Sequence, residues 1–593
     1  MELKNRAEMD SKFTWDLTPI FKTEDEWEAM MKATTEQIRT LATIPGTLSE
    51  SVESFAKDLG EIYAAMENVE KLYGYAFLRK SGDNGDPKSQ EMEARAITLL
   101  TALQSAIAFL NPEILAMDAQ KLDAFMADDS VKTYRHMIED VLRGRKYTLD
   151  AEREKMLAML ADAAQTPSNI FDMFESVDMT FPPVTGEDGK PETLSHGSFS
   201  VFRESKNRAV RREAFEKYFG EYEKYINAIT AMYAGSVKLD CYFSDVRGYA
   251  SACEAALFAN NVPVQLYDNL VSAVSGGLDT MKRYLELRRR ALGLDELHLY
   301  DLYVPMVDEV DFDMPFDKAC ALVKEALKPL GEEYGKLLDR AFAERWIDVY
   351  ENKGKTTGAY SSGVFGVHPY VLLNYTNTLD DAFTLAHELG HSMHSYYSDT
   401  TQDYVNHDYS IFVAEVASTV NEVLLTKYLL KVETDPKRRA YILNHFLEGF
   451  RTTVFRQTLF AEFERRAHEM HQSGRPLTAQ SLNAVYHELN EKYYEGAVVD
   501  VFTDVEWARI PHFYRAFYVY QYSTGFCSAV TIADRILNVP GAAEEYRRFL
   551  STGGSDYPIN ELKIAGVDLT QPEPVANAMR VFAETVDELE KLM

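Results

Sequence analysis

The 593-residue sequence contains only four cysteines, Cys241, Cys253, Cys320 and Cys527, and they are scattered along the chain. They are too few for the disulfide framework of a small secreted protein, and they lack the paired spacing of a thiolate zinc site. Such sparse cysteine is typical of proteins that work in a reducing compartment. The sequence therefore predicts a cytoplasmic protein without structural disulfides.

Long apolar runs are also missing. The longest, residues 96–110, is shorter than a membrane span and is interrupted by polar residues such as Thr98 and Gln104. The first residues of the chain show no apolar segment of the kind that a secretory signal requires. A buried helix explains residues 96–110 better than a membrane span does, and we predict no membrane partner.

Basic residues are scarce relative to acidic ones. The chain has 62 Lys and Arg against 93 Asp and Glu, which gives a formal net charge of −31 at pH 7. Because this charge repels nucleic acid and anionic lipid, neither is an expected partner. A solvated acidic surface is the simplest explanation, and an acidic lining that attracts cationic ligands is the alternative. The composition does not indicate an oligomeric state.

Apolar residues recur at helical spacing along most of the chain, which predicts a mainly α protein. At this length, two or more packed domains are expected. Helical patterning is nearly continuous from residue 16 to about 180, and residues 178–200 then contain two short apolar runs around a Gly- and Asp-rich turn. This change predicts a β-hairpin and a boundary between an N-terminal helical lobe, 1–180, and a second domain, 181–593.

Two further stretches have the composition of β-strands. Residues 300–305 are rich in aromatic and β-branched side chains and predict a short strand. Residues 370–375, which follow a glycine-punctuated region, predict another. The second strand would be either a sheet edge that binds an extended peptide or an ordinary core strand.

The most informative stretch is His387-Glu388-Leu-Gly-His391, a His-Glu-x-x-His motif. Residues 378–381, Thr-Leu-Asp-Asp, have the pattern of a capping box and predict that the motif lies on a helix. Because residues four apart share a helix face, His387 and His391 could bind one metal ion while Glu388 flanks it. A solvated helix face is the alternative, but it does not explain Gly390, since glycine destabilises a helix interior by about 1 kcal/mol. We therefore expect close packing at Gly390.

Two histidines supply half of a zinc site, which uses three protein ligands and keeps one position open. One class of such sites continues as His-Glu-x-x-His-x-x-Gly-x-x-His, but here His394 and Tyr397 occupy the last two positions, which excludes it. The other class takes a glutamate from a second helix. Glu415 lies among apolar neighbours, where an unpaired carboxylate would be costly. The sequence thus predicts zinc held by His387, His391 and Glu415.

Glu422 and His394 lie near these ligands, and we make a separate prediction for each. Glu422 lies seven residues after Glu415 on the same helix face. It either accepts a hydrogen bond from a ligand imidazole or is a surface charge. His394 lies near the ligands on the helical wheel, and we expect it to make a structural hydrogen bond.

A tyrosine-rich segment follows near the C-terminus. Tyr514, Tyr518 and Tyr522 recur every four residues, which predicts an aromatic core stripe on a helix. Alternatively, His512 and one or two of these tyrosines donate hydrogen bonds to an oxyanion.

Taken together, these motifs resemble oligoendopeptidase F, one of the thimet-oligopeptidase-like metallopeptidases. The resemblance rests on residues 387–394 and 412–422, on the tyrosine-rich segment and on residues 553–568, and it extends along the whole chain. It implies a mostly α-helical ellipsoid of two lobes around a deep channel, with a small β-sheet beside the zinc helix. It also makes 181–593 the catalytic domain.

The resemblance further implies a zinc endopeptidase that cleaves internal bonds of short peptides and does not cleave folded proteins. In this family the two motif histidines and the later glutamate bind zinc, and the motif glutamate, here Glu388, is the general base. Family members also use a histidine and tyrosines of the C-terminal segment on the substrate carbonyl. That makes His512, Tyr520 and Tyr522 candidates for this role.

Two other functions fit the same residues. The zinc site could serve a carboxypeptidase or dipeptidyl carboxypeptidase, which needs a cation for the substrate's C-terminal carboxylate, and Arg515 is a candidate for it. The chain could instead be a noncatalytic peptide-binding or scaffolding protein that has kept a zinc helix. The intact Glu388 argues against this, because losing the base is the simplest way to lose activity.

Overall fold

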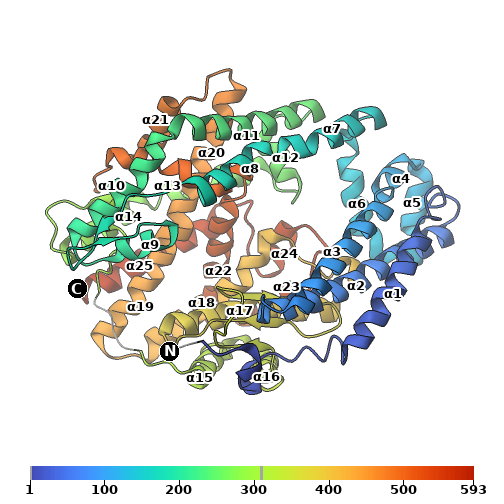
Figure 1. The fold of residues 1–593 in the computed structure, drawn as a ribbon, viewed down its shortest axis with the longest axis horizontal. Coiled ribbons are helices and arrows are strands. Elements are labelled where there is room, and N and C mark those ends of the chain that lie inside the picture. The colour runs from blue at the N-terminus through green and yellow to red at the C-terminus, as the bar shows by residue number, and fades with distance from the viewer. Residues whose placement is uncertain (1–2, 308–311) are drawn as a thin grey trace. The chain divides into compact units, whose positions relative to one another are not determined.

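The computed structural model describes residues 3–307 and 312–593, and most of them are helical (Figure 1). The chain forms two compact units, each built from three stretches of sequence. Unit 1 comprises the described residues of Met1–Lys146, Phe312–Tyr428 and Ile532–Val567, and unit 2 those of Tyr147–Asp311, Leu429–Thr531 and Asp568–Met593. The prediction of a mainly α fold is confirmed. The two units are compact bodies and not functional domains, so they do not test the predicted boundary at residue 180 between the N-terminal lobe and the second domain. That boundary stays a prediction.

Unit 1 opens with helices that share one hydrophobic core. The indole of Trp27 is fully buried there, and its Nε1 donates a hydrogen bond to the Leu72 carbonyl at 3.0 Å. Side-chain oxygens of Thr23, Ser51 and Asp86 cap the first three helices. The helices are α1 (Glu24–Leu41), α2 (Val52–Gly82), α3 (Pro87–Ile107), α4 (Leu110–Ala116), α5 (Ala119–Ala127) and α6 (Arg135–Arg143).

Helices α3 and α4 lie within Pro87–Ala116, the one stretch of the described residues that is long and apolar enough to cross a membrane. Met92, Leu99 and Leu103 are buried against the core of unit 1. Only 22% of the most apolar window is buried, however. The prediction of a buried helix is therefore right for one face of α3 and wrong for the other.

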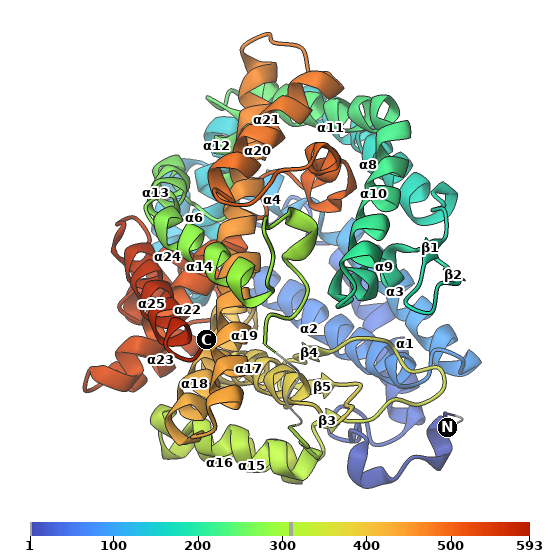
Figure 2. The same ribbon diagram turned by 90° about the vertical axis from the view of Figure 1, so that its left-hand side faces the viewer.

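A small sheet in unit 1 has the strand order β3 (Ile347–Asp348), β5 (Tyr370–Leu372), β4 (Tyr360–Ser362). β3 runs parallel to β5, whereas β4 runs antiparallel to it, with Ser361 opposite Val371. The strand predicted at 370–375 is confirmed for its first three residues. It is the central strand, so the peptide-accepting edge cannot be β5, and β4 is the edge strand that packs against α17 (Leu379–Thr401) (Figure 2).

The rest of unit 1 consists of α17 and the helices that surround it. Residues Thr378 and Asp381 form the predicted capping box at the start of α17. The other helices are α15 (Phe316–Ala326), α16 (Glu332–Ala343), α18 (Ile411–Val432), α23 (Ala542–Leu550) and α24 (Pro558–Ile564). The last turn of α18 belongs to a stretch of unit 2, and α22 (Tyr520–Asn538) likewise begins in unit 2 and ends in unit 1.

Unit 2 is also helical and contains the predicted hairpin, formed by β1 (Val184–Thr185) and β2 (Pro191–Glu192). The helices of unit 2 are α7 (Ala151–Ala164), α8 (Thr166–Met173), α9 (His196–Glu204), α10 (Arg208–Lys224), α11 (Ile226–Arg247), α12 (Ala252–Phe258), α13 (Val264–Ser275), α14 (Leu278–Ala291), α19 (Pro436–Gly449), α20 (Arg456–Gln472), α21 (Ala479–Tyr493) and α25 (Glu573–Glu590). The four cysteines, three in unit 2 and Cys320 in unit 1, are free thiols.

Two local predictions for unit 2 are wrong. No strand forms at 300–305, where Leu299–Asp301 is a 3₁₀ turn instead. The buried carboxylate of Asp301 accepts hydrogen bonds from Arg208 at 2.8 Å and from Arg211 at 2.6 Å, and these ion pairs hold the turn. The helical tyrosine stripe is also absent, because α22 begins only at Tyr520 and Phe517 just before it has a left-handed backbone with φ of 55°.

Candidate metal centre

Helices α17 and α18 approach each other unusually closely at Gly390. A Cβ atom on this residue would lie 2.5 Å from the Cα of Ser418 and 2.6 Å from the carbonyl oxygen of Ala417. Both are backbone atoms of α18, so no other residue fits without moving that helix. The close packing expected at Gly390 is confirmed, and it brings the two helices near enough for their side chains to share one ion.

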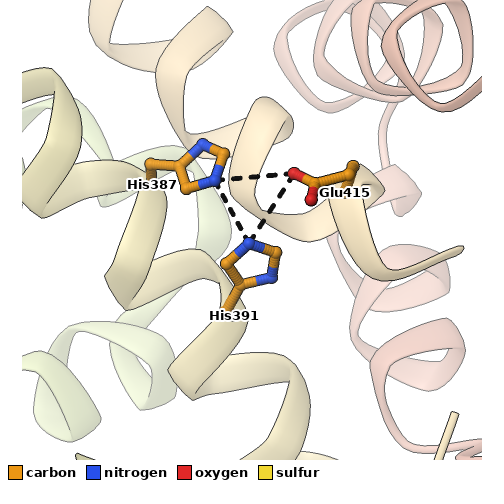
Figure 3. A group of neighbouring side chains, drawn as sticks. All are labelled: His387, His391 and Glu415. Atoms are coloured by element: carbon orange, nitrogen blue, oxygen red, sulfur yellow. Dashed lines mark hydrogen bonds and ion pairs between the residues drawn. The ribbon is translucent and has the colours of Figure 1, made fainter. Parts of the chain in front are cut away.

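The three predicted ligands meet at this crossing, His387 and His391 from α17 and Glu415 from α18 (Figure 3). The two imidazole Nε2 atoms are 3.1 Å apart. Oε2 of Glu415 is 3.5 Å from Nε2 of His387 and 3.7 Å from Nε2 of His391. All three side chains are partly buried.

These separations suit zinc. Two donors that are each about 2.0–2.1 Å from a tetrahedral ion lie roughly 3.3–3.4 Å apart, and the three observed spacings of 3.1, 3.5 and 3.7 Å bracket this value. Two neutral imidazoles and one carboxylate are also a donor set that zinc accepts while it keeps a fourth position open. The residues present therefore fit a catalytic type of zinc site.

Both imidazoles make a further hydrogen bond besides their contacts with the other candidate ligands. Nδ1 of His387 is hydrogen-bonded to Oε1 of Glu422, which confirms the first of the two roles predicted for Glu422. His391 is hydrogen-bonded to the backbone of Ala414. Such contacts fix which ring nitrogen points towards the other donors.

The protonation of the two imidazoles follows from their surroundings. Burial alone would lower the pKa of His387, but the hydrogen bond and charge of Glu422 outweigh it and raise the pKa to about 9. Burial and the neighbouring charge of His387 lower the pKa of His391. Since a metal ligand donates an unprotonated nitrogen, binding of an ion releases the proton from Nε2 of His387.

Glu388 is buried beside these donors, with 6% of the residue exposed. Burial raises the pKa of its carboxyl group to about 7, and the charges of Glu415 and Glu422 act in the same direction. His387 and a backbone hydrogen bond with Ser361 of β4 lower the pKa and limit the shift. A carboxyl group that titrates near neutral pH is suited to take up and give back a proton during a reaction.

His394 does not make the structural hydrogen bond that we expected. Neither ring nitrogen has a hydrogen-bond partner among the residues that the structure describes. The ring instead stacks on Tyr409, with 3.6 Å between the ring centroids, and it also packs on Phe549 of α23. Burial lowers the pKa of His394 to about 3, so the side chain behaves as a neutral aromatic ring.

Two polar residues that the sequence analysis did not identify, Asn421 and Tyr334, connect α18 to its neighbouring helices by hydrogen bonds. Asn421 of α18 is fully buried, and its Nδ2 donates to the carbonyl of Ala386 on α17 at 3.0 Å. Its Oδ1 accepts a hydrogen bond from Tyr334 of α16 at 3.0 Å. The only signal in the sequence was an asparagine within an apolar helix, which does not identify its partners.

The C-terminal candidates belong to unit 2. The hydroxyl of Tyr522 lies 3.4 Å from Nε2 of exposed His512, and the two rings are also in edge-to-face contact. Tyr520 differs from them, since only 2% of it is exposed and its ring packs on Tyr267. The structure thus brings His512 and Tyr522 together and places Tyr520 in the core of the unit.

Comparison with known proteins gives consistent matches. The model of peptidase family M3 matches residues 201–581, and that of oligopeptidase F matches residues 113–181. Oligopeptidase PepF of Bacillus subtilis is 43% identical over all of this chain and 89% of its own length. The crystal structure of oligoendopeptidase-F from Enterococcus faecium aligns with a TM-score of 0.75 and 36% identity over 96% of this chain and 99% of that one. A crystal structure from Chlamydophila abortus aligns with a TM-score of 0.95 and 32% identity over the whole of both chains.

Proposed function

Since this chain belongs to peptidase family M3 and is a metallo-oligopeptidase, we propose that it is a zinc endopeptidase that hydrolyses internal bonds of short peptides. The observation that carries the proposal is the set of spacings between the donor atoms of His387, His391 and Glu415. When bound, zinc supplies Lewis acidity that polarises a carbonyl group and brings the pKa of a water molecule to about 7. Residues 181–593 are the catalytic domain in this proposal, and the chain works in the cytoplasm, where its free thiols persist.

Glu388 acts as the general base. Its carboxylate accepts a proton as the oxygen of water attacks the carbonyl carbon of the peptide bond, and it delivers that proton to the nitrogen as the carbon–nitrogen bond breaks. The raised pKa of Glu388 supports both halves of this exchange. A nearby cation would favour the carboxylate and lower this pKa, so that the base is ionised at neutral pH before each turnover.

The free edge of β4 is the proposed support for the peptide backbone. Residues Tyr360–Ser362 pair with β5 on one side only, and Ser361 lies beside Glu388. An extended peptide could add to this edge by main-chain hydrogen bonds, which bind any sequence. Short, unfolded peptides are therefore the proposed substrates, because a segment must be extended and have unpaired backbone groups to pair with this edge.

His512 and Tyr522 are proposed to stabilise the oxyanion that forms when water attacks. Partial desolvation of the ring and the charge of Arg515 lower the pKa of His512, and the contact between His512 and Tyr522 presents two polar groups together. A donor of this kind contributes about 3–4 kcal/mol to transition-state stabilisation. Tyr520 is the weaker of the three candidates because it is buried.

The test of the general base is the variant Glu388→Gln. It should retain one zinc per chain, measured by elemental analysis, and lose about 10²–10⁴-fold in kcat on an internally quenched peptide. Glu332→Gln, which removes an exposed carboxylate from α16, is the control and should be fully active. A zinc-loaded Glu388→Gln enzyme with undiminished kcat would exclude Glu388 as the base.

A carboxypeptidase or dipeptidyl carboxypeptidase is the alternative that the same zinc site allows. Arg515, the candidate for binding a C-terminal carboxylate, is exposed and lies over the ring of Tyr518. Peptides of graded length with amidated C-termini distinguish the two activities. An endopeptidase cleaves amidated and free peptides equally well, whereas an enzyme that needs the carboxylate loses most of its activity on the amides.

A further inference from the structure

Unit 2 contains a small cavity that the peptidase mechanism does not use. It has a volume of about 30 Å³ and is lined by arginines from three parts of the chain: Arg203 of α9, Arg451 after α19 and Arg456 at the start of α20. The rest of the lining is partly polar, including Tyr303, Thr503 and Glu506, and partly apolar, including Phe199 and Phe215. A cavity needs roughly 10–15 Å³ to hold one water-sized particle, so this one admits a small ion and excludes a peptide.

Buried hydrogen-bonding groups on the wall of this cavity have no partner among residues 3–307 and 312–593. They are Nη1 of Arg451, Nε of Arg203 and Oγ1 of Thr503. The side chain of Arg451 is only 1% exposed, and Thr503 is 2% exposed. An unpaired buried donor costs about 1–3 kcal/mol, and more when it is charged, so three in one cavity indicate a ligand that accepts hydrogen bonds.

The charge around the cavity is also unbalanced. Glu448 pairs with Arg451 at 2.5 Å and with Arg288 at 2.8 Å, so this carboxylate is shared by two guanidinium groups. Glu506, on the cavity wall, is likewise shared by Arg456 at 2.7 Å and Arg509 at 3.7 Å. The cavity wall itself therefore carries three guanidinium groups, those of Arg203, Arg451 and Arg456, and one carboxylate, that of Glu506.

We propose that this cavity binds one small monovalent inorganic anion, such as chloride, between the guanidinium groups of Arg203, Arg451 and Arg456. The anion accepts hydrogen bonds from the unpartnered donors and offsets part of the excess positive charge. Its size follows from the volume of the cavity, and its negative charge follows from the excess of guanidinium groups over carboxylates on the cavity wall. Because the cavity lies within unit 2 and the zinc ligands within unit 1, the proposal is independent of the peptidase assignment.

Tyr303 is the competing source of negative charge. The guanidinium of Arg203 stacks on its ring at 3.8 Å, and that of Arg451 lies 4.6 Å from the ring centroid. Burial alone would raise the pKa of Tyr303, but Arg456, Arg451 and Arg203 outweigh it and lower the pKa to about 7. An anion in the cavity would suppress this ionisation, because the two negative charges compete for the same arginines.

A crystallographic test uses bromide as the probe. Crystals grown without halide and soaked in bromide should show an anomalous peak in the cavity, within hydrogen-bonding distance of Arg451. The variant Arg203→Gln should lose the peak, whereas Arg212→Gln, which removes an exposed, paired arginine on α10, should retain it. Absence of bromide from the parent protein would overturn the proposal. Arg451 itself is unsuitable for substitution because it also neutralises Glu448.

Solution measurements distinguish a real site from an adventitious ion. At constant ionic strength, replacing gluconate by chloride should raise the Tm of the parent and of Arg212→Gln by about 1–3 °C in a saturable manner. Arg203→Gln and Thr503→Val should show a smaller rise. A bromide peak without saturable stabilisation would mean an adventitious ion only and would refute the proposal.

The absorbance of tyrosinate near 295 nm gives an independent readout. In gluconate, one tyrosine per chain should ionise near pH 7, and chloride should move this titration to higher pH by an amount that saturates. The variant Tyr303→Phe should abolish the signal while keeping the bromide site. A Tyr303 titration that does not respond to chloride would show that the phenolate, and not an added anion, balances the arginines.

Discussion

The glycine at the crossing of α17 and α18 allows a sharp test of how the metal centre is built. In Gly390→Ala the new methyl group would lie 2.5 Å from the Cα of Ser418, whereas carbon atoms in contact are about 3.5–4.0 Å apart. Helix α18 would have to retreat by roughly 1 Å at this point. Glu415 lies one turn earlier on the same helix, so its carboxylate would move away from the two imidazoles.

Two opposing effects set the magnitude. Overpacking of this kind destabilises a protein by about 1–3 kcal/mol, while the better helix propensity of alanine returns about 1 kcal/mol. We expect the free energy of unfolding of Gly390→Ala without metal to fall by up to about 2 kcal/mol. We also expect zinc affinity to fall by about 10–100-fold, because the oxygen of Glu415 leaves the spacing that a tetrahedral ion requires.

Competition with a chromophoric chelator measures the zinc affinity, and thermal unfolding with and without zinc separates metal binding from stability. The matched control is Gly335→Ala, at the fourth residue of α16 in the same unit, where an added Cβ meets nothing within 4 Å. This control should bind zinc normally and gain up to about 1 kcal/mol of stability. If Gly390→Ala kept both its zinc affinity and its stability, the close approach of the helices would not be what positions Glu415.

Three further results are expected. Glu422→Gln should lower zinc affinity about 10–100-fold because the hydrogen bond that orients His387 is weakened, and unchanged chelator competition would contradict this. Tyr522→Phe should reduce kcat with little change in Tm, whereas Tyr520→Phe should chiefly lower Tm because Tyr520 is buried. If Tyr520→Phe reduced kcat and Tyr522→Phe did not, Tyr520 and not Tyr522 would be the oxyanion donor. Burial raises the pKa of Glu561 to about 8, so the folded state binds this proton more tightly than the unfolded state does. The free energy of unfolding therefore falls as pH rises from 4.5 towards 8, by at most about 1.4 kcal/mol per pH unit. Glu561→Gln should therefore stabilise the protein more at pH 8 than at pH 5, and equal Tm differences at the two pH values would refute the assignment.

Local signals made the candidate metal centre, in the sense of three donor groups that lie together, predictable from the sequence. The spacing of His387 and His391, the capping box before them and the isolated carboxylate of Glu415 each have a direct physical meaning on a helix. The energetic cost of Gly390 in a helix interior also pointed correctly to close packing. These features needed only short-range reasoning, because each motif lies within one helix.

Predictions that depended on tertiary contacts were less successful. Residues 300–305 have strand composition, but the ion pairs of buried Asp301 with α10 impose a turn. The tyrosine repeat assumed one helix, and the left-handed backbone at Phe517 interrupts it. The cavity between Arg203 and Arg451 is lined by residues that lie far apart in the chain, so no local sequence pattern could predict it.

The division of unit 1 into three stretches has a consequence for synthesis on the ribosome. Helix α17 leaves the ribosome well before α23, yet His394 of α17 packs against Phe549 of α23. At roughly 5–20 residues per second, translation needs on the order of 10–30 s to cover the sequence between them. Throughout that interval the face of α17 that packs on α23 lacks its cover and is open to chaperones or to misassembly. A chain that stops before residue 532 would carry every candidate metal donor and still lack the layer that supports them.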